Sequence, residues 1–433
     1  MSATGVQKWD EIQKDEYERG QPGEINFLKT IGVTQSYMNK YYEEAYQKQA
    51  EGTGHIAWVT SSVPFEVIFA FENVYPFLPE FSGVQASFDR ISTRYQLAAE
   101  RHGYDIELCS VFRTSLGEVI SKRTKEEGAM PRPDFLIVTR HMCHAMGYAW
   151  QAYQRYFNIP IHMQELPYFP GPELETPLAD HYKEYYAESL RGLVRFLEKQ
   201  TGQKFDKERY REVVKLSNRV RDIWLRILEY GKIVPAPYSD WDLYVPLLAI
   251  GSWRGTQMAV DLFEEVIKEV EYRVKNKIGA LPNETFRLFF NGNPSWYNFQ
   301  FVPAILAAKG AIFVCSETNY LFTDWTNAGS GEFEEMADNF VRNYLNLGIR
   351  QKIEYDKRLC REYKVDGAIF QDNRGCRPFV FGFYDVIDAL EKEGLPCLLY
   401  ESNSADLRFW SDDEIRSKLA TFLEILEQRR KGA

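Results

Sequence analysis

Short strand-like runs alternate with longer amphipathic segments along most of the chain. In the N-terminal part, these runs cover residues 56–59, 105–110, 133–139 and 159–166. After residue 283 they return at 286–292, 311–317, 365–373 and 395–402. Runs of this length, separated by segments with helical spacing such as 142–157, are typical of strands that alternate with helices. The pattern therefore predicts an α/β fold with two halves, each built around a parallel sheet of the Rossmann or flavodoxin-like kind.

The segment between these halves has a purely helical pattern. Stretches 180–202, 205–231 and 258–279 have helical spacing, and the second has a broad apolar stripe. Asp206 is its expected N-cap, and Gly231 is expected to end the helix. The predicted domains are an N-terminal helical arm (1–50), a first α/β domain (51–175), a helical module (176–282) and a second α/β domain (283–433).

The charge balance and the lengths of the apolar runs make nucleic acids and membranes unexpected partners. The 433-residue chain has 52 Lys and Arg against 62 Asp and Glu, and its net charge is −10. Since phosphate contacts need an excess of basic residues, we expect no nucleic acid partner. The first twenty residues are charged throughout, and no apolar run reaches the roughly 20 residues of a membrane helix. We therefore expect a cytoplasmic protein with no membrane contact.

Six cysteines are scattered along the chain without a CxxC pair. In a reducing cytosol, disulfides are not expected, so each thiol is a core residue, a metal ligand or a nucleophile. Cys315 and Cys397 lie inside predicted strands, where a small apolar side chain is the simplest interpretation. Cys360 lies on a helix among charged residues and is expected to be structural or exposed.

Cys109, Cys143 and Cys376 share a different context. Each is predicted to lie at the carboxyl end of a strand, where α/β proteins build their sites. Arginines lie close by in sequence and favour the thiolate; they are Arg113, Arg140, Arg374 and Arg377. Spacing alone leaves two interpretations equally open, three unrelated buried thiols or one metal site. Three thiolates suit an iron–sulfur cluster with one open iron better than a structural zinc, which normally has four protein ligands.

Seven segments of the chain are shared with one known family. They are "SSVPFEVIFAFENVYP", "LCSVFRTSLG", "HMCHAMGYAWQAYQRYFNIPIHMQELPY", "GSWRGTQMAVDLFEEV", "FFNGNPSWYNF", "NRGCRPFVFGFYD" and "YESNSADLRFWSDDEIRSKLATFLEIL". In these segments, over nearly its whole length, the chain resembles the cluster-bearing subunits of the 2-hydroxyacyl-CoA dehydratase and benzoyl-CoA reductase family. "SWRGT" and "NPSW" look most like the larger cluster subunit of benzoyl-CoA reductase.

The resemblance implies a set of ligands. It places the cluster ligands at Cys109, Cys143 and Cys376, with one [4Fe-4S] cluster per chain. His144 follows Cys143 directly, so it is a candidate to donate a proton or to form a hydrogen bond with a cluster sulfur. A structural histidine is an equal alternative.

The resemblance also implies catalytic and substrate-binding residues. Ser61, Ser62 and Glu66 would approach the thioester and the cluster, and Glu80 is a further carboxylate candidate. Arg377 is a candidate for binding an anionic CoA ester. Arg254 is a second one, although a structural salt bridge at a helix start is an equal alternative for it.

A late acidic pattern of the family is incomplete in this chain. The pattern Glu-x-Asp-x-x-Asp-x-Arg appears as Glu401, Asn403, Asp406 and Arg408. Because Asn403 replaces an acidic residue, the segment is a candidate for a structural role here.

The implied activity is ATP-dependent reduction of an aromatic acyl-CoA through a radical anion. The chain lacks GxxxxGK[ST], so ATP is expected to be hydrolysed by a separate iron–sulfur activator. The implied partners are that activator, a homologous second cluster-bearing subunit and the acyl-CoA. Three alternatives remain: a subunit of a (R)-2-hydroxyacyl-CoA dehydratase that eliminates water through a ketyl radical, a stand-alone double-cluster reductase of small molecules, and a non-catalytic partner subunit.

Overall fold

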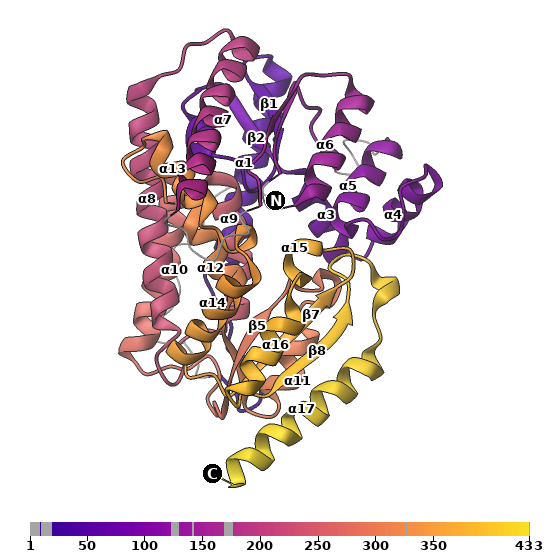
Figure 1. The fold of residues 1–433 in the computed structure, drawn as a ribbon, viewed down its shortest axis with the longest axis vertical. Helices are drawn as coiled ribbons and strands as arrows, with labels where there is room; N and C mark the ends of the chain where they lie inside the picture. Colours follow the sequence, from indigo (N-terminus) through magenta and orange to yellow (C-terminus); the bar gives the residue numbers. More distant parts are fainter. Residues whose placement is uncertain are drawn as a thin grey trace.

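The chain folds around two parallel sheets (Figure 1). The computed structural model describes Trp9 and residues 20–122, 130–140, 143–168, 176–325 and 327–432. The first sheet contains β1 (His55–Val59), β2 (Val74–Phe77), β3 (Phe135–Thr139) and β4 (Ile161–Gln164). The second contains β5 (Phe286–Asn291), β6 (Ala311–Ser316), β7 (Gly367–Asn373) and β8 (Cys397–Ser402). All neighbouring strands are parallel, which confirms the predicted α/β fold class.

The two sheets have the same strand order. It is β2-β1-β3-β4 in the first sheet and β6-β5-β7-β8 in the second. In each sheet the chain starts in an inner strand, moves to one edge, and then crosses back to the other side of that inner strand. The order therefore reverses between β1 and β3 and between β5 and β7. Such a reversal leaves a crevice outside the carboxyl ends of the strands, where ligands of α/β proteins bind.

Two details of the sequence-based strand prediction were wrong. Residues 105–110 do not form a strand: Leu108 donates its N–H to the carbonyl of Asp105 in a turn, at 3.1 Å, and helix α5 begins at Ser110. Strand β2 was missed because Pro76 lies inside it. A proline is tolerated there because β2 is an edge strand, and an edge strand leaves one side without ladder hydrogen bonds.

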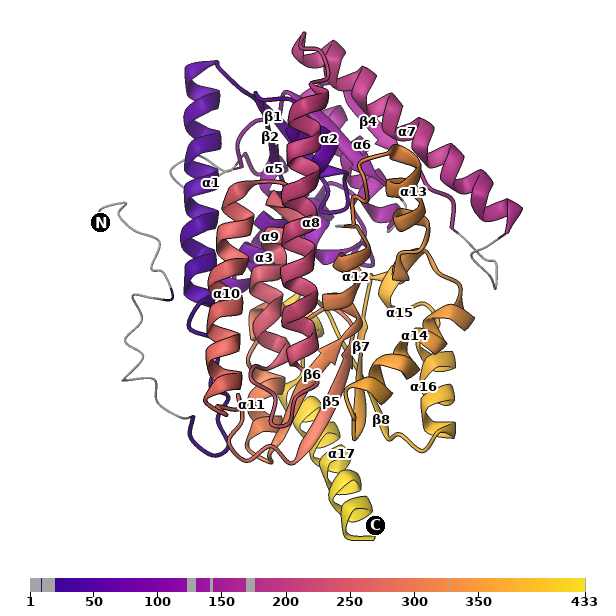
Figure 2. The ribbon, with the colours of Figure 1, turned by 90° about the vertical axis from the view of Figure 1, so that its left-hand side faces the viewer.

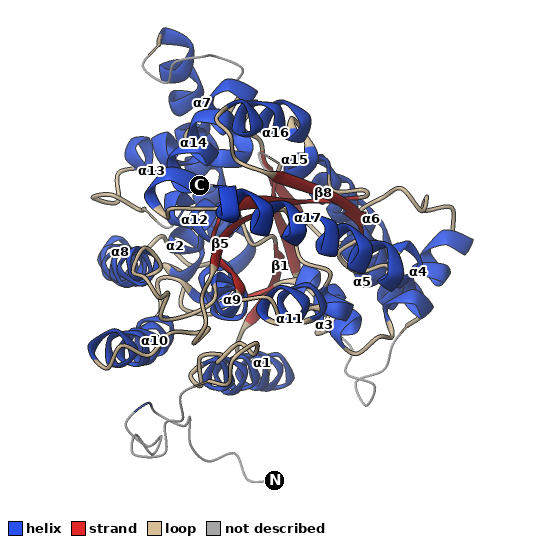
Figure 3. Ribbon diagram, turned by 90° about the horizontal axis from the view of Figure 1, so that it is seen from below, coloured by secondary structure: helices blue, strands red, loops and turns tan. Residues whose placement is uncertain are grey.

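Helices surround both sheets. Those of the first half are α2 (Phe65–Phe69), α3 (Pro79–Phe88), α4 (Ser92–Arg101), α5 (Ser110–Ile120) and α6 (His144–Phe157). Those of the second half are α11 (Phe301–Ala307), α12 (Glu317–Trp325), α13 (Phe333–Val341), α14 (Ile349–Glu362), α15 (Arg377–Val380), α16 (Phe383–Lys392) and α17 (Asp412–Gly432). Viewed from below, strands lie inside a shell of helices (Figure 3).

The long helices α1 (Ile31–Glu51), α8 (Lys207–Tyr230) and α10 (Gln257–Lys275) run side by side along one side of the molecule (Figure 2). The short helix α9 (Tyr244–Trp253) packs against α1 and α10, and the long helix α7 (Pro177–Thr201) lies beside the first sheet. The side chain of Asp206 accepts hydrogen bonds from the N–H groups of Glu208 and Arg209, at 2.9 and 3.0 Å. This confirms the predicted N-cap of α8, and Gly231 follows its last residue as predicted.

Apolar side chains form one large buried cluster around each sheet, and the long helices contribute to both. Trp224 of α8 and Tyr244 of α9 belong to the cluster of the second sheet. Tyr186 and Leu190 of α7 belong to the cluster of the first sheet. Val214 of α8 belongs to the cluster of the first sheet as well, so α8 packs against both clusters and joins the two halves. None of the helices in the described residues is long and apolar enough to cross a lipid bilayer.

Candidate iron–sulfur site

The structure brings Cys109, Cys143 and Cys376 together. All three thiols line one inner cavity of ≈ 160 Å³. Cys109 precedes α5, Cys143 follows β3 and precedes α6, and Cys376 follows β7 and precedes α15. Two thiols thus come from the first half and one from the second. The cavity lies where the switch points of both sheets meet, since Ser61 after β1 and Asn293 after β5 also line it.

All three cysteines lie at helix starts. Each is the N-cap residue of the helix that follows it, although its side chain makes no capping hydrogen bond. The nearby N–H groups act to lower the thiol pKa values: those of Val111 and Phe112 at Cys109, those of Ala145 and Met146 at Cys143, and that of Phe379 at Cys376. A helix start favours a thiolate in this way because its N–H groups carry partial positive charge.

Burial acts in the opposite direction. It raises the pKa of all three thiols, to about 12 for Cys143, and the other thiols nearby raise the pKa values of Cys143 and Cys376 further. Without a cation, the three sulfurs are therefore protonated at neutral pH. A bound metal would supply the positive charge that three neighbouring thiolates need.

The arrangement of the three thiols suits a cluster of several irons better than a single metal ion. Within the described part of the chain, no group of three or more His, Cys, Asp or Glu side chains is arranged to hold a single metal ion. Three thiols around one cavity, each facing it from a separate helix start, instead match the ligands of a polynuclear cluster, in which each cysteine binds a different iron. The residues fit such a group, and the ligand assignment itself stays a prediction.

Two of the predicted polar residues line the inner cavity. Glu80 accepts a hydrogen bond from the backbone N–H of Ser61, with 2.6 Å between the nitrogen and the carboxyl oxygen. Burial raises the pKa of Glu80 to about 7. This carboxyl group can therefore hold a proton near neutral pH, and it is a source of a proton inside a largely apolar space.

Ser62 and Glu66 lie outside the set of side chains that line this cavity. The Ser62 hydroxyl is hydrogen-bonded to that of Thr139 at the end of β3. Glu66 is buried in α2 and accepts a hydrogen bond from Ser217 at 2.5 Å. These contacts place both side chains behind the wall of the cavity.

Arg254 is the ion-pair partner of Glu66. Its Nε lies 3.0 Å from a Glu66 carboxyl oxygen, and both side chains are almost fully buried. The guanidinium group also donates to the carbonyls of Val63 and Ile250, at 2.5 and 3.3 Å, and lies over the ring of Phe65. With its hydrogen bonds filled by the protein, Arg254 links α9 to α2, which matches the structural alternative that the sequence left open.

Apolar side chains form most of the wall of the inner cavity, and the aromatic ones among them are large. The aromatic side chains are Phe81, Phe112, Tyr244, Trp296, Phe322 and Phe379. Trp296 and the polar Asn293 belong to the "NPSW" turn, and Thr318 follows β6. Asn293 and Thr318 were missed in the sequence, although the rule that ligands bind at strand ends would have found both. This wall of aromatic and aliphatic side chains disfavours water and leaves few polar groups facing the thiols.

A second, outer cavity of ≈ 620 Å³ adjoins the first. Cys143, Leu345 and Pro378 line both cavities. His144 and Arg377 line the outer one, as do Arg140 and Lys352. Lys352 was not predicted, because nothing distinguishes it in sequence from the other basic residues of the amphipathic helix α14. Glu165 also lines this cavity and pairs with Arg140, so Lys352 and Arg377 give the outer cavity a net positive charge beside the Cys143 thiol.

Comparison with known proteins gives the family. The family model described as "2-hydroxyglutaryl-CoA dehydratase, D-component" matches residues 60–426. The (R)-2-hydroxyisocaproyl-CoA dehydratase alpha subunit of Clostridioides difficile is 26% identical, over 92% of this chain and 96% of the relative. A benzoyl-CoA reductase subunit of Thauera aromatica is 24% identical, over 85% of this chain and 88% of the relative. The (R)-2-hydroxyglutaryl-CoA dehydratase subunit alpha of Acidaminococcus fermentans is 26% identical, over 70% of this chain and 63% of the relative.

These relatives are subunits of lyases and of an oxidoreductase, and they match most of the chain. The span of the family model, residues 60–426, includes all three thiols. The predicted family is confirmed, because the family model extends from the end of β1 into the C-terminal helix. The chain belongs to the 2-hydroxyglutaryl-CoA dehydratase D-component family of enzyme subunits.

Proposed function

We propose that the chain is the cluster-bearing subunit of an ATP-dependent iron–sulfur enzyme that reduces an aromatic acyl-CoA thioester. The observation that supports this most is the inner cavity, where three thiols from both halves face one largely apolar space with six aromatic side chains in its wall. Three sulfur donors suit an iron–sulfur cluster, and a flat aromatic acyl group packs well against aromatic side chains. The relatives are named after acyl-CoA substrates, which supports a thioester as the substrate class.

In this proposal, Cys109, Cys143 and Cys376 hold one [4Fe-4S] cluster. When bound, the cluster would supply electrons at low potential to the thioester. The aromatic wall would keep water away from the reacting group. Arg377 and Lys352 in the outer cavity would attract the negatively charged CoA portion. Glu80 would hold a proton within the inner cavity.

The proposal includes two protein partners. The relatives are each named as one subunit of a larger enzyme, which supports a second subunit in the active complex. The sequence lacks GxxxxGK[ST], which supports a separate activator that hydrolyses ATP and delivers the electron.

Replacing Glu80 by Gln is expected to lower kcat by about 100-fold, the usual contribution of a general acid. The amide keeps the size of the side chain and its hydrogen bond from Ser61, but it has no proton to give. Turnover of the anaerobic complex measures the effect, and bound iron should be unchanged. A variant that turns over at the wild-type rate would exclude Glu80 as the proton source.

A dehydratase subunit is the second candidate, because the matching family model and two of the relatives named above are dehydratases. The deciding assay supplies the anaerobic complex with activator, ATP and a strong reductant, and offers benzoyl-CoA or a 2-hydroxyacyl-CoA in separate reactions. We expect benzoyl-CoA to be consumed. Consumption of the hydroxyacyl ester alone would overturn the reductase proposal and establish the dehydratase.

A further inference from the structure

The loops that hold Cys109 and Cys376 touch each other through their backbones. Gly375 precedes Cys376 and has a φ of +85°, in the left-handed region. A Cβ atom on Gly375 would lie 3.0 Å from the carbonyl oxygen of Glu107 and 3.2 Å from that of Leu108. Leu108 precedes Cys109, so this contact joins the two residues that come directly before two of the thiols. Only glycine allows both the conformation and the close approach.

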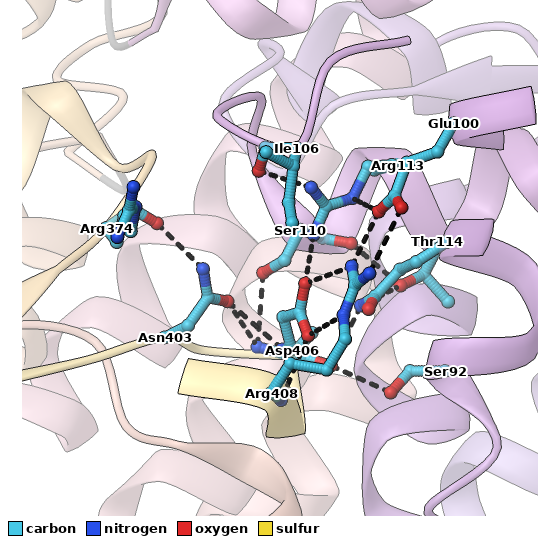
Figure 4. Close-up of polar contacts among 12 residues, drawn as sticks. Ser92, Glu100, Ile106, Ser110, Arg113, Thr114, Arg374, Asn403, Asp406 and Arg408 are labelled. Carbon is cyan, nitrogen blue, oxygen red and sulfur yellow. Dashed lines mark hydrogen bonds and ion pairs between the residues drawn. The ribbon is translucent and has the colours of Figure 1, made fainter. Parts of the chain in front are cut away.

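Polar contacts hold the same two loops together (Figure 4). Asn403 follows β8, and its amide nitrogen donates to the carbonyl of Arg374 at 2.9 Å. Its amide oxygen accepts from the N–H groups of Ala405 and Asp406, both at 3.1 Å. The N–H of Ala405 also donates to the hydroxyl of Ser110, at 3.1 Å. The segment after β8 is thereby bonded to the Cys376 loop on one side and to the start of α5 on the other.

A buried ion pair completes this arrangement. The guanidinium group of Arg113 in α5 donates to the carboxylate of Asp406 and to the carbonyl of Ile106. Both charged side chains are 0% exposed. We call Ser110, Arg113, Asn403 and Asp406 the inter-half clamp, because its members come from both α/β halves. Asp406 also accepts from Arg408, so moving this segment away from α5 would take from the buried Arg113 guanidinium its nearest carboxylate.

We propose that Gly375 and the inter-half clamp are positioning elements that fix the distance between the thiols of Cys109 and Cys376. The inference rests on the proposed function, in which these thiols bind the same cluster. The contact at Gly375 sets how closely the two loops approach. The clamp prevents them from moving apart when the site is empty. Two ligands from different halves are then held in place before a cluster is inserted. Residues that contact metal ligands commonly orient the ligands in this way.

The test compares Gly375→Ala with Gly394→Ala in the full chain. Gly394 has a φ of +87°, close to that of Gly375, but a Cβ there would meet no atom within 4 Å. Both variants therefore experience the same backbone strain, and only Gly375→Ala forces the two cysteine loops apart. Each protein is purified anaerobically and reconstituted with iron and sulfide. Iron per chain, the EPR spectrum of the reduced protein, the rate of iron release to a chelator and the thermal unfolding midpoint are measured.

We expect Gly375→Ala to release iron about tenfold faster than the wild type, the order expected when a support of a metal ligand is disturbed. Its EPR spectrum should also change, while Gly394→Ala keeps the wild-type spectrum and release rate. If both variants unfold earlier to the same extent but keep wild-type spectra and release rates, the contact is merely structural and the inference is wrong. A wild-type chain that binds no iron would instead contradict the proposed function.

Discussion

Replacing Cys376 by alanine is expected to remove the iron from the chain and to abolish turnover. Cys376 is the thiol of the inner cavity that comes from the second half. Without it, only the two thiols of the first half remain, and the second half contributes no sulfur ligand to the cavity. Loss of a partner of a metal ligand already weakens binding by about 10–100-fold, so loss of a ligand should exceed that. Iron and sulfide per chain after anaerobic reconstitution give the result.

Cys397→Ala is the matched control for this experiment. Cys397 lies in β8, partly buried, and does not line the inner cavity. Its sulfur donates to the nearby carbonyl of Leu395, at 3.5 Å. The control should keep its iron and its turnover. A Cys376→Ala variant that retained iron and activity would refute the ligand assignment and support the non-catalytic alternative.

Replacing Arg254 by methionine is expected to lower the free energy of unfolding by about 3–5 kcal/mol, the usual result of removing one partner of a buried ion pair. The methionine fills a similar volume, but the Glu66 carboxylate then loses its ion-pair partner in a buried position. The double variant Glu66→Gln/Arg254→Met should recover part of the loss, because no charge is left unpaired. Urea unfolding of all three proteins measures these differences.

Arg219→Met provides the reference for an exposed pair. Arg219 of α8 pairs with Glu264 of α10, and its side chain is 62% exposed. Removing it should change the free energy of unfolding by less than about 1 kcal/mol, as for most surface pairs. If Arg254→Met instead kept its stability and raised KM for the acyl-CoA, Arg254 would be a substrate-binding residue and not a structural one.

The repeated pattern of strands and helices was sufficient to predict the fold class. Seven of the eight strand-like runs are strands in the structure, because buried parallel strands are short, apolar and followed by clear helical patterns. The run at 105–110 failed since its apolar residues, Ile106 and Leu108, are exposed in a turn before α5. Short apolar runs do not distinguish strands from turns when tertiary contacts decide the outcome.

The thiols were found in sequence because cysteine is rare and its chemistry is distinctive. Cys109 was assigned to the site because it was expected to end a strand. It does line the cavity, but it is the N-cap residue of α5 and does not end a strand. The pairing of Glu66 with Arg254 was hidden, because the two residues are 188 positions apart and only packing of α2 against the long helices joins them. Lys352 was hidden for the same reason, since only the fold brings α14 beside the loop of Cys376.

The aromatic wall could not be predicted residue by residue. Aromatic side chains make up 15% of the chain, and most of them fill the two cores. Those that line the inner cavity come from both halves and from the segments between them, for example Phe112 of α5, Tyr244 of α9 and Phe379 of α15. Their common feature is position around the switch points, which only the folded arrangement of both sheets defines.

Quantitation of iron and acid-labile sulfide in the anaerobically purified chain, with EPR of the reduced protein, tests the central claim most directly. One [4Fe-4S] cluster held by three thiols predicts about four iron and about four sulfide per chain and the EPR signal of a single reduced cluster. About eight iron per chain would favour the double-cluster alternative. A chain that binds no iron, or that binds zinc without sulfide, would contradict the claim that Cys109, Cys143 and Cys376 hold an iron–sulfur cluster.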